Sequence, residues 1–185
     1  MKTKNKIIGG AVLAAAGTLL YFRNRQNIPP KAITIKNFRP EKYTGKWYEI
    51  ARIDFRYERN MDNTTAEYSL NKNGSITVVN SGYNYKKQKF TTARGIARFV
   101  NLPNEGMLKV SFFGPFYAGY NIIAIDRKYR YALVAGRNLN YLWILSRETT
   151  IPEDIKESYL QQARSIGYNT DRLVWPNHGS CPTGF

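Results

Sequence analysis

Few residues of this chain could carry out covalent or acid–base chemistry. The 185 residues include one histidine, His178, and one cysteine, Cys181, and both lie near the C-terminus. A thiol and an imidazole can form a nucleophilic pair, but this pair would lie beyond the last predicted element, away from any pocket. No His/Cys/Asp cluster has metal-ligand spacing, and no glycine-rich phosphate loop follows a predicted strand. We therefore predict a protein that is not an enzyme and that needs no metal or cofactor.

The side chains that could bind a ligand are basic and aromatic, and they gather in four segments between predicted strands. These segments are residues 56–63, 84–88, 113–119 and 136–140. We predict that they form the rim of a cavity, with the rim residues Arg56, Arg59, Lys86, Lys87, Phe116, Tyr117 and Arg137. A basic rim above an apolar cavity suits an amphiphile with an acyl tail and an anionic head. The alternative is that these are ordinary solvated loop charges.

The elements that must position these segments are β-strands. From Trp47 onward, runs rich in β-branched and aromatic residues, such as Ile76–Val79, alternate with turn signals, such as Asn71–Gly74. The pattern predicts eight strands, at about residues 46–55, 63–70, 75–83, 89–100, 106–113, 117–126, 130–136 and 140–147. Eight antiparallel strands joined by hairpins form an up-and-down β-barrel. The predicted fold class is therefore all-β.

One amphipathic helix is predicted after the barrel. Thr150 would cap it, Pro152 would lie in its first turn, and Gly167 would end it. Its apolar face would consist of Ile155, Tyr159, Leu160 and Ala163. Residues 173–175 can add a short strand.

Three motifs of this chain resemble the signature of the lipocalin family. The matching residues are Gly45 and Trp47 in the first motif, Asp126 and Tyr129 in the second, and Arg147 in the third. The resemblance covers roughly residues 37–176, and the chain is especially similar to the bacterial outer-membrane lipocalins, which also resemble apolipoprotein D. It implies an eight-stranded barrel with a C-terminal helix, in which Arg147 packs over the Trp47 ring at the closed end. We assign these signature residues a structural role.

Strand alternation predicts the inward face of the barrel if Trp47 points inward. The predicted cavity-lining residues are Ala66, Tyr68, Val78, Asn80, Ala93, Gly95, Ala97, Leu108, Val110, Phe112, Tyr141, Trp143 and Leu145. An eight-stranded barrel can hold one small ligand if its inward side chains are not all large.

Two features of this inward face bear on a cavity. Its fourth strand contributes a row of small residues, Ala93 to Ala97, that would leave volume for a ligand. Alternatively, Phe112 and Trp143 fill that volume from the opposite wall. Asn80 would need a polar partner when buried, either from a ligand or from a water.

The first 46 residues carry most of the net charge of +15, because they contain ten Lys/Arg and one acid. Residues 1–22 are predicted to be a basic leader and a hydrophobic membrane anchor or uncleaved signal, since no charge lies between Ile7 and Phe22. The run Ala14–Ala16 leaves cleavage as the alternative. Residues 23–36 are predicted to be a linker, 37–176 the barrel with its helix, and 177–185 a flexible tail. Many bacterial lipocalins carry an acylated cysteine after the leader, and this chain has none there.

We predict that the protein binds and stores or transports a lipid amphiphile, a fatty acid or a lysophospholipid, with the tail in the cavity. One alternative is a membrane-tethered adaptor with a mostly filled barrel, and another is a carrier of a rigid hydrophobe such as a sterol or pigment. Nucleic-acid binding is not expected, because no helix carries a basic stripe. The resemblance implies a Gram-negative cell envelope, with the barrel facing the periplasm, and a role in membrane maintenance under stress. It leaves homodimerisation and the choice between inner and outer membrane open.

Overall fold

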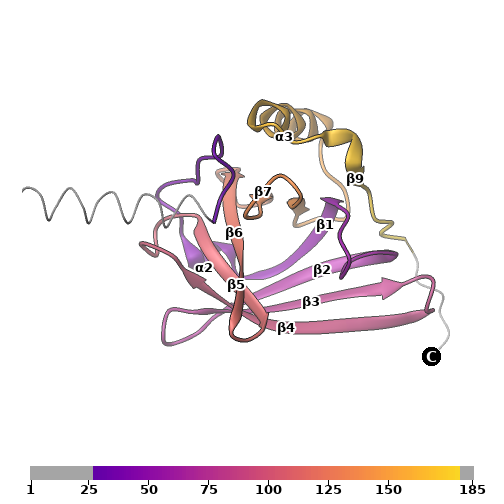
Figure 1. Cartoon of the computed structure of the whole chain (residues 1–185), viewed down its shortest axis with the longest axis horizontal. Coiled ribbons are helices and arrows are strands. Elements are labelled where there is room, and N and C mark those ends of the chain that lie inside the picture. Colours follow the sequence, from indigo (N-terminus) through magenta and orange to yellow (C-terminus); the bar gives the residue numbers. More distant parts are fainter. Residues whose placement is uncertain (1–26, 180–185) are drawn as a thin grey trace, which may run out of the picture.

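The computed structural model describes residues 27–179, which form a closed antiparallel barrel with a long helix outside it (Figure 1). The strand order is β2-β3-β4-β5-β6-β7-β8-β1, and β1 also pairs with β2, which closes the barrel. The strands are β1 (Gly45–Ile53), β2 (Met61–Leu70), β3 (Ile76–Asn84), β4 (Lys89–Phe99), β5 (Met107–Phe113), β6 (Phe116–Ile125), β7 (Tyr131–Ala135) and β8 (Leu142–Ser146). The predicted barrel is confirmed, and each strand lies within two residues of its expected bounds.

The seam between β1 and β2 is closed by the C-terminal segment. β1 pairs with β2 only over Gly45–Tyr48, and further along the strand it pairs instead with β9 (Leu173–Val174). The following residues continue along the seam, where Asn63 N donates to Asn177 O at 2.8 Å and His178 Nε2 donates to Glu49 O at 2.8 Å. Asn177 and His178 are therefore held against the barrel, whereas we predicted a flexible tail from residue 177. Cys181 lies outside the described residues.

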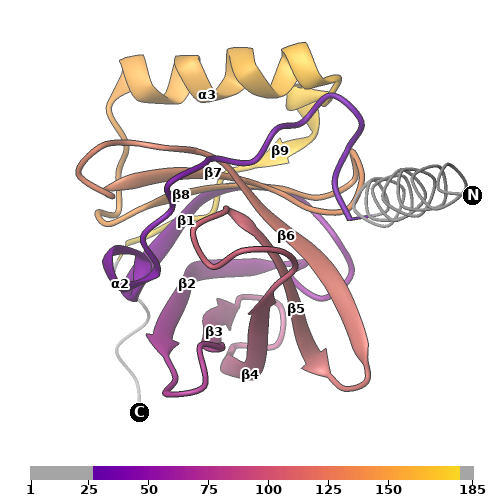
Figure 2. The ribbon, with the colours of Figure 1, turned by 90° about the vertical axis from the view of Figure 1, so that its left-hand side faces the viewer.

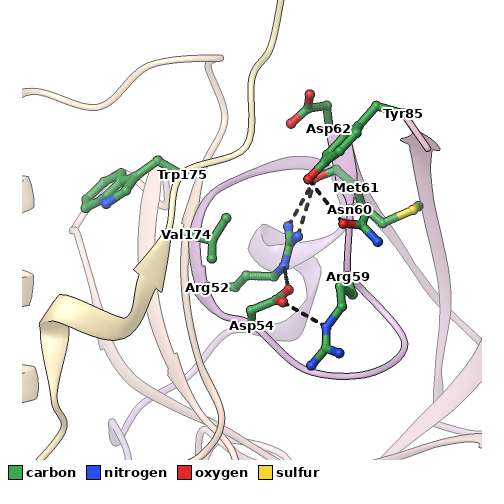
Figure 3. A pocket seen from close by; sticks show the side chains of 9 residues that line it. All are labelled: Arg52, Asp54, Arg59, Asn60, Met61, Asp62, Tyr85, Val174 and Trp175. Atoms are coloured by element: carbon green, nitrogen blue, oxygen red, sulfur yellow. Dashed lines mark hydrogen bonds and ion pairs between the residues drawn. The ribbon is translucent and has the colours of Figure 1, made fainter.

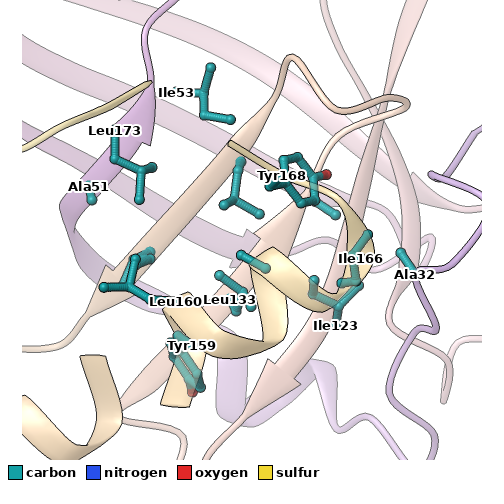
Figure 4. Packing of buried hydrophobic residues seen from close by; sticks show 14 of the residues in the cluster. Ala32, Ala51, Ile53, Ile123, Leu133, Tyr159, Leu160, Ile166, Tyr168 and Leu173 are labelled. Carbon is teal, nitrogen blue, oxygen red and sulfur yellow. The ribbon is translucent and has the colours of Figure 1, made fainter. Parts of the chain in front are cut away.

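Helix α3 (Glu153–Ile166) lies across the outer face of the barrel, above β7 and β8 (Figure 2). Its buried residues are Tyr159, Leu160, Ala163 and Ile166, and they pack on Leu133, Ile144 and other outward residues of the barrel (Figure 4). The helix begins later than predicted, because Pro152 rather than Thr150 is its N-cap. Gly167 ends it as predicted, in the left-handed conformation (φ 112°) that favours glycine.

The closed end of the barrel is built around Trp47. The short helix α2 (Pro40–Tyr43) precedes β1, and Trp47 Nε1 donates to Tyr43 O at 2.9 Å. The Trp47 side chain is fully buried in an inner apolar cluster with Tyr43, Phe38 and Leu145. The opposite end, formed by residues 54–60, 85–88, 113–117 and 136–141, is here called the mouth.

Residues 27–36 pack on the barrel, although we predicted residues 23–36 to be a linker. Ile28, Ala32 and Thr34 are buried. The Ile35 amide donates to Ile122 O at 3.0 Å, which ties the segment to β6. Within the described part of the chain, no helix is long and apolar enough to cross a bilayer. The predicted anchor, residues 1–22, lies outside that part.

Candidate functional site: the barrel interior and its mouth

Strand register places the predicted lining residues on the inward face of the barrel. Trp47 pairs with Ala66, Ala66 with Asn80, and Asn80 with Ala93, and directly paired residues share a face of the sheet. The register and the inner cluster place on that face Ala66, Tyr68, Val78, Asn80, Ala93, Gly95, Ala97, Leu108, Val110, Phe112, Trp143 and Leu145. The Tyr141 ring stacks on Trp143 near the mouth, with 6.3 Å between their centroids. Contact between any of these lining residues and a ligand stays a prediction.

Exposure of these inward residues increases from the closed end to the mouth. Val78, Ala97 and Leu108 are buried deep in the barrel. Val110, Phe112 and Trp143 are half-buried, and Ala93 is exposed although it faces inward. The interior is therefore accessible to solvent in the half near the mouth, where β4 and β5 pair only over Ile96–Phe99, and it is sealed at the Trp47 end.

The small residues of β4 do not all leave free volume. A Cβ added at Gly95 would lie 2.8 Å from Phe112 Cδ1, so the Phe112 ring already covers this glycine. Ala97 is buried opposite Val110. Of the three small residues, only Ala93 borders accessible space, so the accessible volume lies in the half of the barrel near the mouth.

Asn80 presents an unsatisfied polar atom to this interior. Its Oδ1 is buried and has no hydrogen-bond partner among the described residues. Leaving a buried carbonyl oxygen unpaired costs about 1–3 kcal/mol. A hydroxyl or amide donor of a ligand, or a water, would satisfy it.

Three tyrosines form a hydroxyl network above Trp47. The Tyr120 hydroxyl lies 2.6 Å from that of Tyr43 and 2.7 Å from that of Tyr68. Burial raises the pKa of all three phenols above the ordinary value, so they are neutral. Sequence reasoning identified only Tyr68, because strand alternation does not show which distant tyrosines meet across a barrel.

A buried ionic cluster lies between these tyrosines and the mouth. Arg52 Nη1 donates to Glu49 Oε1 at 2.6 Å, and Arg52 Nη2 donates to the Glu58 carbonyl at 2.6 Å. The carboxyl group of Glu58 accepts a hydrogen bond from Trp143 Nε1 at 3.0 Å. Burial, with the nearby charge of Glu49, raises the pKa of Glu58 to about 8.

Sequence reasoning missed this cluster because β1 is irregular. A register shift between Glu49 and Ala51 breaks the alternation that starts at Trp47, so Arg52 faces inward while Ala51 packs beneath α3. Simple alternation from Trp47 does place Glu49 on the inward face. This position was the signal from which the buried cluster could have been predicted.

The loop 54–60 lies across part of the mouth. The Phe55 ring packs edge-on against Tyr141 and Trp143, with centroid distances of 5.5 Å and 5.9 Å. Further along the loop, the Tyr57 ring lies 6.5 Å from that of Phe113 on the opposite side of the mouth. The loop 54–60, together with the hydrogen bond between Glu58 and Trp143, thus narrows the entrance to the barrel.

The predicted rim residues surround this entrance, and they are exposed. The basic ones are Arg56, Arg59, Lys86, Lys87 and Arg137, and the aromatic ones are Phe116 and Tyr117. Arg59 pairs with Asp54 at 3.4 Å, and Arg56 lies over the Tyr57 ring at 5.7 Å.

A hollow of about 370 Å³ lies between the mouth loops 54–60 and 85–88 and the β1–β2 seam (Figure 3). It is lined by Arg52, Asp54, Arg59, Asn60, Met61, Asp62, Tyr85, Val174 and Trp175. Asp54 accepts hydrogen bonds from both arginines of this hollow, at 3.3 Å and 3.4 Å. Both arginines of the hollow are therefore already paired, and sequence reasoning named one of them, Arg59, as a rim residue.

The signature residues meet at the closed end. Asp126 accepts hydrogen bonds from the backbone amides of Lys128, Arg130 and Tyr131 and so holds the β6–β7 turn. The carbonyl of Tyr129, which has a positive φ of 57°, accepts from Arg147 Nε at 3.2 Å. These residues are used for structure and lie far from the mouth.

No group of three or more His, Cys, Asp or Glu side chains that could hold a metal occurs among residues 27–179. His178 contacts the outside of β1, where its ring lies edge-on to Tyr48.

Comparison with known proteins agrees with this geometry. The Lipocalin-like domain family matches residues 40–178. The chain is 46% identical to outer membrane lipoprotein Blc of Citrobacter freundii over 89% of this chain and 93% of that protein. It is 30% identical to apolipoprotein D of Mus musculus over 80% of each chain. Insecticyanin of Manduca sexta has the same fold, with a TM-score of 0.66 at 16% identity over 82% of this chain and 88% of that one. The chain belongs to the lipocalin family and, within it, is similar to the bacterial outer membrane lipoproteins.

Proposed function

We propose that this protein binds a lipid amphiphile, a fatty acid or a lysophospholipid, in the half of the barrel near the mouth. The observation that carries the proposal is the open interior, in which the inward-facing Ala93 is exposed while Trp47 seals the other end. An acyl tail would lie against Val110, Phe112 and Trp143. Burial of such a tail gives about 0.8 kcal/mol per methylene group.

The head group would lie among the basic side chains of the rim, where Lys86, Lys87 and Arg137 are exposed. Asn80 would accept a hydrogen bond from a hydroxyl of the ligand, and such hydroxyls occur in lysophospholipids.

The related outer membrane lipoproteins suggest where the protein acts. We propose a membrane-anchored location in a bacterial cell envelope, with the barrel in the periplasm and a role in membrane maintenance. Because this chain lacks a cysteine after its leader, residues 1–22 would form the anchor.

Organic extraction of the purified full-length protein, followed by mass spectrometry, tests the proposal. We expect an acyl lipid at about one molecule per barrel. Titration of a fluorescent fatty acid should then saturate, and Lys86→Glu with Lys87→Glu should weaken its binding. An empty barrel that does not bind the fluorescent fatty acid would favour the adaptor with a mostly filled interior. A sterol or pigment in the extract would show that the ligand is a rigid hydrophobe and not an acyl lipid.

A further inference from the structure

The mouth of the barrel carries an unusual concentration of exposed aromatic rings. Tyr57 is 73% exposed, Phe113 71% and Phe116 79%. These rings come from two loops, residues 54–60 and 113–117, that meet where Tyr57 lies 6.5 Å from Phe113. Large apolar side chains gathered on one surface mark a site of interaction.

The exposed charges around these rings all have one sign. In the mouth loops and at the first residue of β4, every exposed ionisable side chain with a charge at neutral pH is basic, namely Arg56, Arg59, Lys86, Lys87, Lys89 and Arg137. The acidic residues of the mouth, Asp54 and Glu58, are partly buried. Asp54 is paired with Arg52 and Arg59, and Glu58 accepts a hydrogen bond from Trp143. The closed end differs, because acidic residues such as Glu41 and Glu148 lie there among its lysines and arginines.

The chain enters the described fold beside this mouth. Asn121 Nδ2 donates both to Asn27 O at 2.6 Å and to Gly136 O at 3.2 Å. A Cβ added at Gly119 would lie 2.3 Å from Asn27 O and 3.2 Å from Arg137 N, so these backbones are packed together. If residues 1–22 are the anchor, the five steps from Phe22 to Asn27 can span at most about 18 Å. The anchor would then hold the edge of the mouth near the bilayer.

We propose that the mouth is a docking surface for a bilayer that contains anionic lipids. The aromatic rings would enter the interface, where amphipathic rings are favoured, and each basic residue near an anionic surface would add to the attraction. The inference deepens the proposed function, because a docked mouth would let a lipid pass between bilayer and barrel without crossing water. In this respect it rests on the proposed binding of a lipid in the barrel.

Depth-dependent fluorescence on the full chain tests this docking. In a Cys181→Ser background, an environment-sensitive dye is attached to Phe116→Cys at the mouth or to Lys72→Cys in the exposed β2–β3 turn of the closed end. The proteins are inserted into phosphatidylcholine vesicles with about one third phosphatidylglycerol. We expect lipid-borne spin labels to quench the mouth dye about twofold or more and to leave the closed-end dye unchanged.

Three results would overturn the docking. One is equal quenching at both positions, and another is no quenching at the mouth. The third is a blue shift at the mouth that needs no vesicles and grows with protein concentration, which would assign the surface to a second copy of the chain.

Lipid extraction separates this inference from the proposed function, and charge reversal tests the electrostatic part of the docking. Lys86→Glu with Lys87→Glu should reduce the quenching of the mouth dye in anionic vesicles, and unchanged quenching would contradict the electrostatic part of the docking. Extraction of bound lipid is measured independently of docking. Bound lipid without quenching would overturn the docking alone, whereas quenching without bound lipid would support docking and remove the lipid-carrier function.

Discussion

The guanidinium of Arg147 lies 3.9 Å from the centroid of the Trp47 ring. Its nitrogens also donate to the carbonyls of Lys46, Thr44, Lys42 and Tyr129, at distances between 2.7 Å and 3.2 Å. One side chain therefore joins β1, β8, the end of α2 and the β6–β7 turn. It covers the tryptophan that seals the barrel, so we expect it to contribute strongly to stability.

Arg147→Ala should lower the free energy of unfolding by about 2–4 kcal/mol, because it removes a cation–π contact and leaves several carbonyls without donors. Arg147→Lys should recover only part of this loss, since an ammonium group cannot reproduce the planar fork. Urea denaturation measures the change. The matched control is Arg127→Ala in the exposed β6–β7 turn, which should cost less than about 0.5 kcal/mol. Equal effects of the two alanine variants would show that the Arg147 contacts are not stabilising.

Tyr120→Phe should destabilise the barrel by about 1–3 kcal/mol, because the hydroxyls of Tyr43 and Tyr68 would both lose their partner in a buried site. The denaturant dependence should keep its slope, since the fold is unchanged. Tyr117→Phe, on the same strand but 42% exposed, is the control and should have little effect. A neutral result for Tyr120→Phe would indicate that water reaches these hydroxyls.

Glu58→Gln should change how stability depends on pH. Burial raises the pKa of this carboxyl from 4.5 to about 8, so the folded protein retains a proton that the unfolded chain releases. The stabilisation from this proton is complete below pH 4.5 and is lost as the pH rises through about 8. Relative to Glu58→Gln, the wild type should lose about 1–2 kcal/mol over this range, less than the full shift implies because Glu58 is partly exposed.

Unfolding at a series of pH values, with Glu67→Gln on the exposed face of β2 as the control, checks this prediction. The curve of Glu67→Gln should run parallel to that of the wild type. A wild-type curve that stays parallel to that of Glu58→Gln would show that Glu58 is ionised in the folded protein at neutral pH.

The strands could be predicted from the sequence because their alternation and turns are local signals. The same alternation, continued from Trp47, predicted the inward face of β2, β3 and β4 through Ala66, Asn80 and Ala93. It failed within β1, where the bulge after Glu49 turns Arg52 into the barrel.

Features that depend on distant contacts could not be predicted in this way. The Tyr120 network and the Phe112 ring over Gly95 arise only when the sheet closes. The placement of residues 27–36 depends on packing against β6, which composition alone does not indicate.

The central claim is that the inward face near the mouth holds the acyl tail, and one pair of variants tests it most directly. Ala93→Trp places an indole inside the barrel, whereas Thr92→Trp places it on the exposed outer face of the same strand. In a titration with a fluorescent fatty acid, Ala93→Trp should raise Kd about tenfold or more, equivalent to about 1.4 kcal/mol, while Thr92→Trp should leave it unchanged. Equal Kd values for the two variants would contradict the claim.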